Sequence, residues 1–358
     1  MKGKGLHIIC AAMICIATMA ISACDGEDLN GLRGKDVLSF VTLNRNIKEG
    51  SRAAYTGVFG ATVFHANTLD ELNNLTQKDQ SKIHDGIDNA AISERNGVWS
   101  TDQEKYWPSG GGILVVAYSP YSNIGTDRVR EPYNMHSPYI YGNWQNNQTD
   151  LLFADVRWLE VATSSNSPVP VTFNHALANV SVNIRVASSG LGEESWKMTL
   201  TGVEMMRVRN QGSVTINNNG SNGWSTNNNG AWNVDDKEFE TDMKYSGRVL
   251  LTTTPLGVLQ NKIVMPQHLL VKENASHQAL KITYDLETTH KYIDHNGKEI
   301  VQVVTDKNLV KEIPLKTANI TKWEMGRHIT YNVVFNFSKP IEFEGSTNPW
   351  TDVPNIEL

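Results

Sequence analysis

The regular alternation of side chains between Val180 and Val186 is the feature that most narrows what this chain can fold into. Over this range every second residue is apolar, and the residues between them are polar, namely Ser181, Asn183 and Arg185. Successive side chains of a β-strand point to opposite faces. The pattern therefore predicts a strand with one buried face and one solvated face.

Comparable β-like runs recur along the chain, separated by turn residues. Only Thr68–Ile92 has a partly helical pattern. The β-like runs are Val37–Leu43, Val58–His65, Ile113–Tyr118, Asp150–Trp158, Trp196–Val208, Arg248–Thr253, Leu256–Met265, Ala279–Leu286, Lys291–Val304 and Trp323–Phe337. Short strands at this spacing are typical of β-sandwiches. We therefore predict an all-β fold.

Turn chemistry supports these strands and divides them into two sets. Pro108–Gly112 precedes one strand, and Asn296-Gly297 is a hairpin signal because both residues accept positive φ angles. The segment Ser164–Pro170 carries no strand pattern and is rich in Ser and Pro. We predict two tandem β-sandwich domains, residues 37–168 and 169–358.

The first residues have the layout of a secretion signal. Lys2 and Lys4 precede the apolar run Ile8–Ile21, which is shorter than the roughly 20 residues that a spanning helix needs. We predict a signal peptide over residues 1–23 and a flexible tether over residues 24–36.

Cysteine use points to a lipid anchor at Cys24. The chain has three cysteines, and Cys10 and Cys15 lie inside the predicted signal, so the mature chain cannot form an internal disulfide. Ile21-Ser22-Ala23-Cys24 resembles the lipobox of bacterial lipoproteins. This resemblance implies that Cys24 is acylated and holds the protein at the outer membrane. An ordinary signal peptide is the alternative.

Composition and motifs weigh against several functional classes. The formal net charge is −6 with dispersed Lys and Arg, which does not favour nucleic acid as a partner. The sequence contains no HExxH, GxSxG or phosphate-loop motif. We expect no catalytic residues, no metal and no cofactor, although a pair of acidic residues could in principle act on a glycosidic bond.

An Asn-rich stretch, residues 217–232, contains Trp224 and Trp232. Indole rings beside amide side chains can stack on a sugar and bond to it, so these two residues are a candidate glycan contact. A solvated hairpin whose tryptophans tuck against the sandwich explains the same residues.

An ordered set of short stretches resembles the fimbrillin family, the lipoprotein-derived subunits of donor-strand pili. The stretches, in chain order, are the lipobox, Ser51–Ala54, Lys105–Pro108, Val116–Pro120, Asp150–Ala154, Val171–Ala178 and Trp323–Arg327, followed by Ile341 and Trp350.

The resemblance implies two transthyretin-like β-sandwiches and assembly into a fimbrium at the cell surface. It implies cleavage between Arg52 and Ala53, which removes the strand Val37–Leu43 and opens a groove for a strand of another fimbrial subunit. An uncut anchor subunit with an ordinary loop arginine at 52 fits the same residues. The tail Ile341–Leu358 is the natural donor, although Pro349 and Pro354 interrupt it.

The implied role is adhesion to a host or bacterial surface receptor, either glycan or protein. A monomeric, glycan-binding surface lipoprotein is the alternative function.

Overall fold

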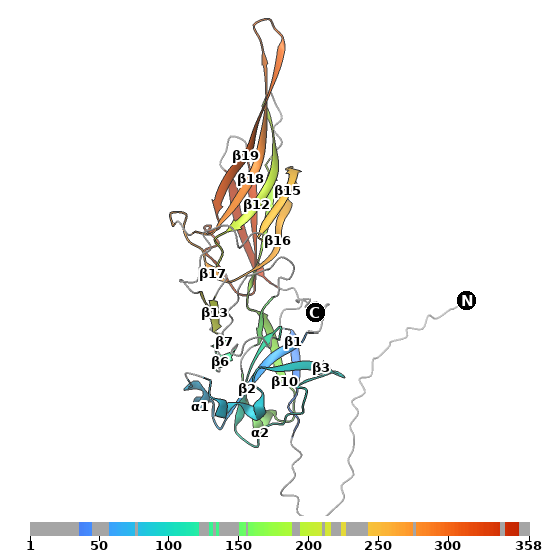
Figure 1. Cartoon of the computed structure of the whole chain (residues 1–358), viewed down its shortest axis with the longest axis vertical. Coiled ribbons are helices and arrows are strands. Elements are labelled where there is room, and N and C mark those ends of the chain that lie inside the picture. Colours follow the sequence, from blue (N-terminus) through green and yellow to red (C-terminus); the bar gives the residue numbers. More distant parts are fainter. Residues whose placement is uncertain are drawn as a thin grey trace, which may run out of the picture. The chain divides into compact units, whose positions relative to one another are not determined.

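β-Strands dominate the described part of the chain, so the all-β prediction is confirmed (Figure 1). The computed structural model describes residues 36–44, 57–75, 78–121, 129–131, 134–135, 150–154, 157–187, 194–209, 212–215, 223–226, 243–274, 277–336 and 341–350. Asp36–Leu358 belongs to one contact unit.

The first half of the chain contributes an eight-stranded sheet with the order β2-β3-β4-β1-β10-β8-β5-β9. Its strands are β1 (Phe40–Asn44), β2 (Phe59–Ala66), β3 (Ala90–Arg95), β4 (Val98–Ser100), β5 (Gly112–Ser119), β8 (Leu152–Ala154), β9 (Arg157–Glu160) and β10 (Val169–His175).

In this sheet β2 pairs with β5 as well as with β3. The path of backbone pairing therefore returns to β2, and the sheet folds around its own apolar core, to which β1, β2, β5 and β10 all contribute. Every residue of β5 is buried, as its continuous apolar sequence predicts. The sandwich expected for this half is thus a single sheet with connected faces.

The second half of the chain forms a sandwich of two four-stranded sheets, which enclose one large apolar cluster. The first sheet contains β16 (Leu256–Val264), β11 (Ala178–Val186), β21 (Arg327–Phe335) and β22 (Glu342–Pro349), in that order. The second contains β15 (Lys244–Leu250), β12 (Glu194–Met206), β18 (Ala279–Ile293) and β19 (Glu299–Pro314).

The polar atoms inside this second core are paired. Trp323 Nε1 donates to the Tyr331 hydroxyl at 3.0 Å, and that hydroxyl donates to Leu315 O at 2.9 Å. Burial raises the pKa of Tyr331, so the phenol stays neutral and keeps its proton for this bond.

The remaining elements are short. The small strands are β6 (Val129–Glu131), β7 (Asn134–Met135), β13 (Gly212–Thr215), β14 (Gly223–Thr226), β17 (Gln267–His268) and β20 (Lys322–Trp323). The helices are α1 (Leu69–Asn73), α2 (Val161–Ser164) and the 3-10 turns η1 (Gln80–Lys82) and η2 (His84–Gly86).

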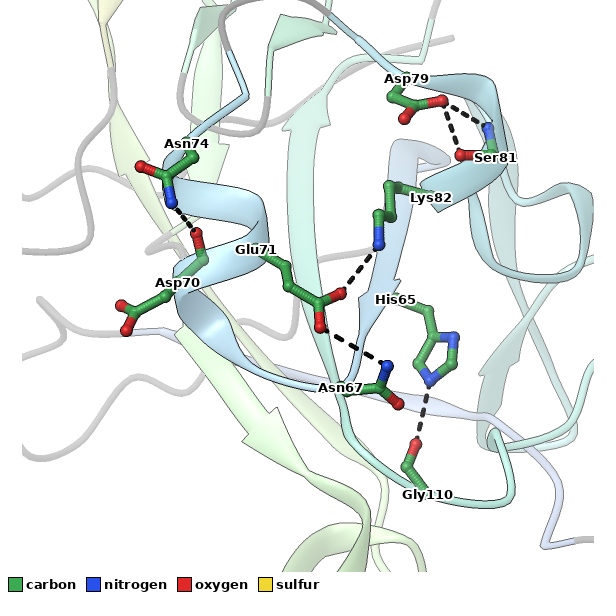
Figure 2. A network of polar contacts seen from close by, with 9 residues as sticks. All are labelled: His65, Asn67, Asp70, Glu71, Asn74, Asp79, Ser81, Lys82 and Gly110. Carbon is green, nitrogen blue, oxygen red and sulfur yellow. Dashed lines mark hydrogen bonds and ion pairs between the residues drawn. The ribbon is translucent and has the colours of Figure 1, made fainter.

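The predicted partly helical segment is an insertion tied down by polar contacts (Figure 2). Lys82 Nζ lies 2.8 Å from Glu71 Oε2 and so links η1 to α1. Asp79 caps η1 by accepting a hydrogen bond from Ser81 N at 2.9 Å. Leu72, a residue of α1, is buried and packs the helix onto the core. The helices here are only one turn long because the apolar spacing does not continue at helical period.

A turn forms at Asn296-Gly297 as predicted, but of these two residues only Gly297 has a positive φ angle. Gly297 has a φ of 78°, and its N–H donates to Asp294 O at 3.0 Å, joining β18 to β19. Both strands are longer than the sequence predicts. β18 begins at Ala279 as expected but continues past Leu286 to Ile293, and β19 continues past Val304 to Pro314.

The proposed domain boundary at residue 168 lies directly before β10. This strand pairs with β1 and β8 and so belongs to the eight-stranded sheet. Only two residues separate the end of β10 from the start of β11, and β11 belongs to the second sandwich. The division into two domains stays a prediction.

Candidate functional site

β1 closes the eight-stranded sheet between β4 and β10. It pairs in parallel with β10 from Phe40↔Val169 to Asn44↔Phe173. On its other side it meets β4 in a single antiparallel pair, Phe40↔Trp99. All other strands of the sheet lie after residue 58. Two things therefore link β1 to them, namely its backbone pairing with β10 and β4 and the covalent connection through residues 45–58.

The side chains of Leu38, just before β1, and of Phe40, in β1, point into the core and fill it. Leu38 and Phe40 are 1% and 3% exposed, whereas Val41 on the opposite face is 39% exposed. The Phe40 ring packs edge-on against Phe59 with 5.9 Å between the ring centroids. Removing β1 would therefore leave an apolar groove in the sheet.

The segment preceding β1 makes further backbone bonds. Leu38 N donates to Lys105 O at 2.7 Å, and Trp107 N donates to Asp36 O at 2.9 Å. On the other side, Val169 N donates to Ser39 O at 2.8 Å. Backbone groups on both walls of the groove would thus lose their partners together with β1.

His84 supports the wall of this groove from η2. Its Nε2 lies 2.6 Å from the carbonyl oxygen of Tyr106, and Tyr106 forms an antiparallel bridge with Val37. Burial lowers the pKa of His84, the Tyr106 carbonyl acts against this shift, and nearby His65 adds to it. The neutral imidazole is therefore the form that the fold accommodates.

The C-terminal segment is docked on its own chain as the edge strand β22. Val333 pairs with Phe343 and Ile329 with Thr347, and the Phe343 ring stacks on Tyr331 at 5.1 Å. The tail proposed as a donor is thus already paired over Glu342–Pro349. Residues 351–358 lie outside the described part.

Trp350 then anchors the end of β22 near the junction with the first sheet. Its ring stacks on His175 with 3.9 Å between centroids and an angle of 10°, and Trp350 N donates to Gly326 O at 2.8 Å. His175 Nδ1 lies 2.5 Å from Asp150 Oδ2. Burial raises the pKa of Asp150, and the bond from His175 opposes this shift. Residues far apart in the sequence thus form one buried stack.

Most of the residues singled out from the sequence lie outside the described part of the chain. Cys24, Arg52, Ala53 and Trp232 lie outside the described residues. Trp224 lies on β14, where it pairs with Val214. The lipid anchor, the cleavage site and the glycan contact therefore stay predictions.

A polar pocket of about 210 Å³ lies over β11, β21 and β22. Asn183, Arg185 and Glu342 contribute to its lining, which contains no aromatic ring. Asn183 Nδ2 donates to Asn332 Oδ1 at 3.2 Å, so part of this polarity is satisfied internally. The pocket lacks the stacking surface expected of the predicted Trp-based glycan contact.

Two features are absent from the described residues. Among them, no three His, Cys, Asp or Glu side chains come together in a way that could hold a metal ion. Within the same residues, no helix has the length and apolarity required to cross a membrane.

Comparison with solved structures finds a fimbrial protein of similar fold. A fimbrial protein from Bacteroides vulgatus has a TM-score of 0.53 and 15% identity, with 87% of this chain and 99% of that chain covered. The tip fimbrial protein Mfa3 from Porphyromonas gingivalis, with a C-terminal truncation, has a TM-score of 0.38 and 13% identity, with 83% and 95% covered. No curated protein sequence matches.

A model of the fimbrillin-like family matches residues 59–350, from the first residue of β2 to the anchoring Trp350. This is a family of fimbrial and adhesion subunits, and it is not an enzyme family. Over most of its length, and in agreement with the motifs in the sequence, this chain therefore belongs to the fimbrillin-like family.

Proposed function

We propose that this chain is an exported, lipid-anchored fimbrial subunit that polymerises by donor-strand exchange and serves adhesion at the cell surface. The observation that carries the proposal is the position of β1. Together with the residues just before it, β1 contributes the buried side chains Leu38 and Phe40 to the core. Its covalent connection to the other strands of the sheet runs through residues 45–58, which include Arg52.

Cleavage after Arg52 would convert β1 from a covalently attached strand into a noncovalent ligand. What would then hold it is the pairing with β10, the single pair with β4 and the burial of two apolar side chains. Full burial of such side chains is worth about 1.5–3 kcal/mol each. A competing strand that supplies the same side chains and backbone bonds can replace β1, as in other cases of strand addition.

The end of the tail has the residue spacing that this groove requires. Ile356 and Leu358 are apolar and two residues apart, like Leu38 and Phe40. Pro354 precedes them, which is a position before a strand where proline is tolerated. We assign the donor role to this part of the tail, and β22 stays paired with β21 in its own subunit.

Cys24 would hold the first subunit at the outer membrane. Acylation with more than one hydrocarbon chain gives stable anchoring, and residues 24–36 are the tether between lipid and fold. Other fimbrial subunits are the expected partners, and the receptor is a surface glycan or protein.

The test is cleavage of the purified chain with an arginine-specific protease, followed by gel electrophoresis in detergent without boiling. We expect the wild-type chain to form a ladder of multimers and Arg52→Ala to remain a single band. A chain that ends at Pro354 should be cut but should not form the ladder, because it lacks Ile356 and Leu358. A single band from the cut wild-type chain, or equal ladders from all three chains, would contradict strand exchange.

A further inference from the structure

β19 is an unusually long edge strand. It spans Glu299–Pro314 and pairs with β18 on one side, while no described strand pairs with its other side. The third strand, β12, begins only at the pair Glu194↔His290. Among the described strands, the β18–β19 hairpin is therefore a two-stranded ribbon beyond His290, and Figure 1 shows it extending past β12 and β15.

Apolar side chains on this ribbon face solvent. Val301 and Val303 are 52% and 55% exposed, and Tyr292 and Ile293 on β18 are 51% and 64% exposed. Val304 is exposed as well. Isolated exposed apolar residues are common, but several on one unpaired edge mark an interaction site.

The usual protection of an edge strand is missing from the first half of β19. Ile300–Thr305 contains no charge, proline or glycine, and these features normally block edge-to-edge pairing. The protective features occur on either side of it. Lys298 and Glu299 precede the segment, Asp306 follows it, and Asn308 adopts a φ of 55° at an irregularity in the pairing. The open segment is thus short and defined.

The free backbone groups of this segment can be assigned. Asp294 N donates to Lys298 O at the turn, and in an antiparallel pair the bonded positions alternate along each strand. Ile300, Gln302 and Val304 accordingly bond to β18. Val301 and Val303 direct their N–H and C=O groups away from β18, toward the open edge.

We infer that this edge binds a second copy of the same chain by antiparallel β19–β19 pairing centred on Gln302. In this register Val301 of one copy lies opposite Val303 of the other, so their outward backbone groups exchange hydrogen bonds. Gln302 lies opposite itself on the two-fold axis. The result is one continuous four-stranded ribbon made of two hairpins.

The side chains are self-complementary in this register. Ile300 lies opposite Val304 of the second copy, and because Tyr292 pairs with Ile300 within each hairpin, an apolar row crosses the joint. Lys298 lies opposite Asp306 of the second copy, twice by symmetry. Among the described residues, neither side chain has an opposite charge as a partner within its own chain. Opposite charges across a strand pair favour this register over its neighbours.

This contact is separate from strand exchange, because it uses neither β1 nor the tail. It would join subunits side by side, whereas strand exchange joins them end to end. The experiments therefore use the processed chain with Arg52→Ala, in which strand exchange is blocked, and with Cys24→Ala, so that an introduced cysteine is the only thiol.

Disulfide trapping tests the register. Residues opposite each other at a non-hydrogen-bonded antiparallel position have Cα atoms about 4.5 Å apart, within the range that a disulfide bridges. We expect Gln302→Cys to form a covalent dimer under mild oxidation. Val303→Cys is the matched control on the same strand: it faces residue 301 and not itself, so it should remain mostly monomeric.

Charge reversal tests the ends of the contact. In sedimentation velocity experiments over a concentration series, Lys298→Asp should raise the dimer dissociation constant about tenfold or more, because it places like charges opposite each other. Lys298→Asp combined with Asp306→Lys should restore dimerisation. Lys272→Asp, at an exposed lysine outside the segment Lys298–Asp306, should leave it unchanged.

These outcomes separate the inference from the proposed function. A chain that stays monomeric at every concentration would overturn the inference. Equal crosslinking of Gln302→Cys and Val303→Cys, or no response to Lys298→Asp, would overturn it too. None of these results affects the ladder expected after cleavage at Arg52.

Discussion

Replacing Phe40 by alanine tests whether β1 is a structural part of the core. Phe40 is 3% exposed and packs edge-on against Phe59 at 5.9 Å. Truncation of a buried phenylalanine costs about 3–5 kcal/mol, because apolar contact is lost and a cavity remains. This is a large fraction of the roughly 5–15 kcal/mol that stabilises a typical protein.

Val41→Ala is the matched control on the neighbouring residue. Val41 points to the opposite face of β1 and is 39% exposed, so its truncation should cost less than about 1 kcal/mol. Both variants keep the backbone pairing with β10. The difference between them therefore isolates the inward side chain.

The assay is equilibrium unfolding in urea of the uncut chain, followed by tryptophan fluorescence. With a slope of about 1–3 kcal/mol per M of urea, Phe40→Ala should lower the unfolding midpoint by more than about 1 M and Val41→Ala by much less. Equal midpoints for the two variants would refute the claim that β1 fills the groove. The basis of the proposed exchange would then be lost.

Three further predictions concern the anchor, a turn and an acid response. Cys24→Ala should move the protein from the membrane fraction to the soluble fraction of cells, because the thiol that carries the lipid is removed; unchanged fractionation would exclude Cys24 as the anchor. Gly111→Ala should cost at least about 2 kcal/mol, since Gly111 has a φ of 71° and its new Cβ would lie 2.2 Å from Ala66 O. Gly110→Ala, which meets nothing within 4 Å, should change the urea midpoint little, and similar losses for both would contradict this reading of the turn. Burial lowers the pKa of His84 from its usual value of 6.5, so the unfolded state binds the proton more readily than the folded state. Stability is therefore present above pH 6.5 and is lost as the pH falls below it. Thermal unfolding between about pH 7.5 and about pH 5.5 should show a smaller loss for His84→Gln, which does not titrate in this range, and parallel losses in both proteins would count against His84.

Local patterns in the sequence predict the strands well. The alternation from Val180 to Val186 becomes β11, with Asn183 and Arg185 on the wetter face. Ser181, predicted on that face too, is instead buried, and its hydroxyl accepts from Asn261 N at 3.1 Å. Asn296-Gly297 makes the hairpin turn. The buried pair Leu38 and Phe40 follows from the same two-residue spacing. These features depend only on neighbours in the chain.

Long-range pairing could not be predicted in the same way. Nothing in the pattern of β1 specifies parallel pairing with β10, and the stack of Trp350 on His175 joins residues from opposite ends of the fold. The sequence underestimates the length of β19 because the residues of this strand are mostly exposed, so the alternation that reveals a buried face is weak there. Strand order is decided by packing of the whole core, which a local pattern does not contain.

If the tail donates a strand as proposed, the stack of Trp350 on His175 also limits how far apart two neighbouring subunits can be. Because it fixes the point from which the tail leaves its own subunit, the reach of the donor residues is counted from Trp350. A fully extended chain covers roughly 20 Å between Trp350 and Ile356. In the proposed exchange, a neighbour that accepts Ile356 would have to present its vacant groove within that distance of Trp350. The stack would then set the spacing between successive subunits of the fibre.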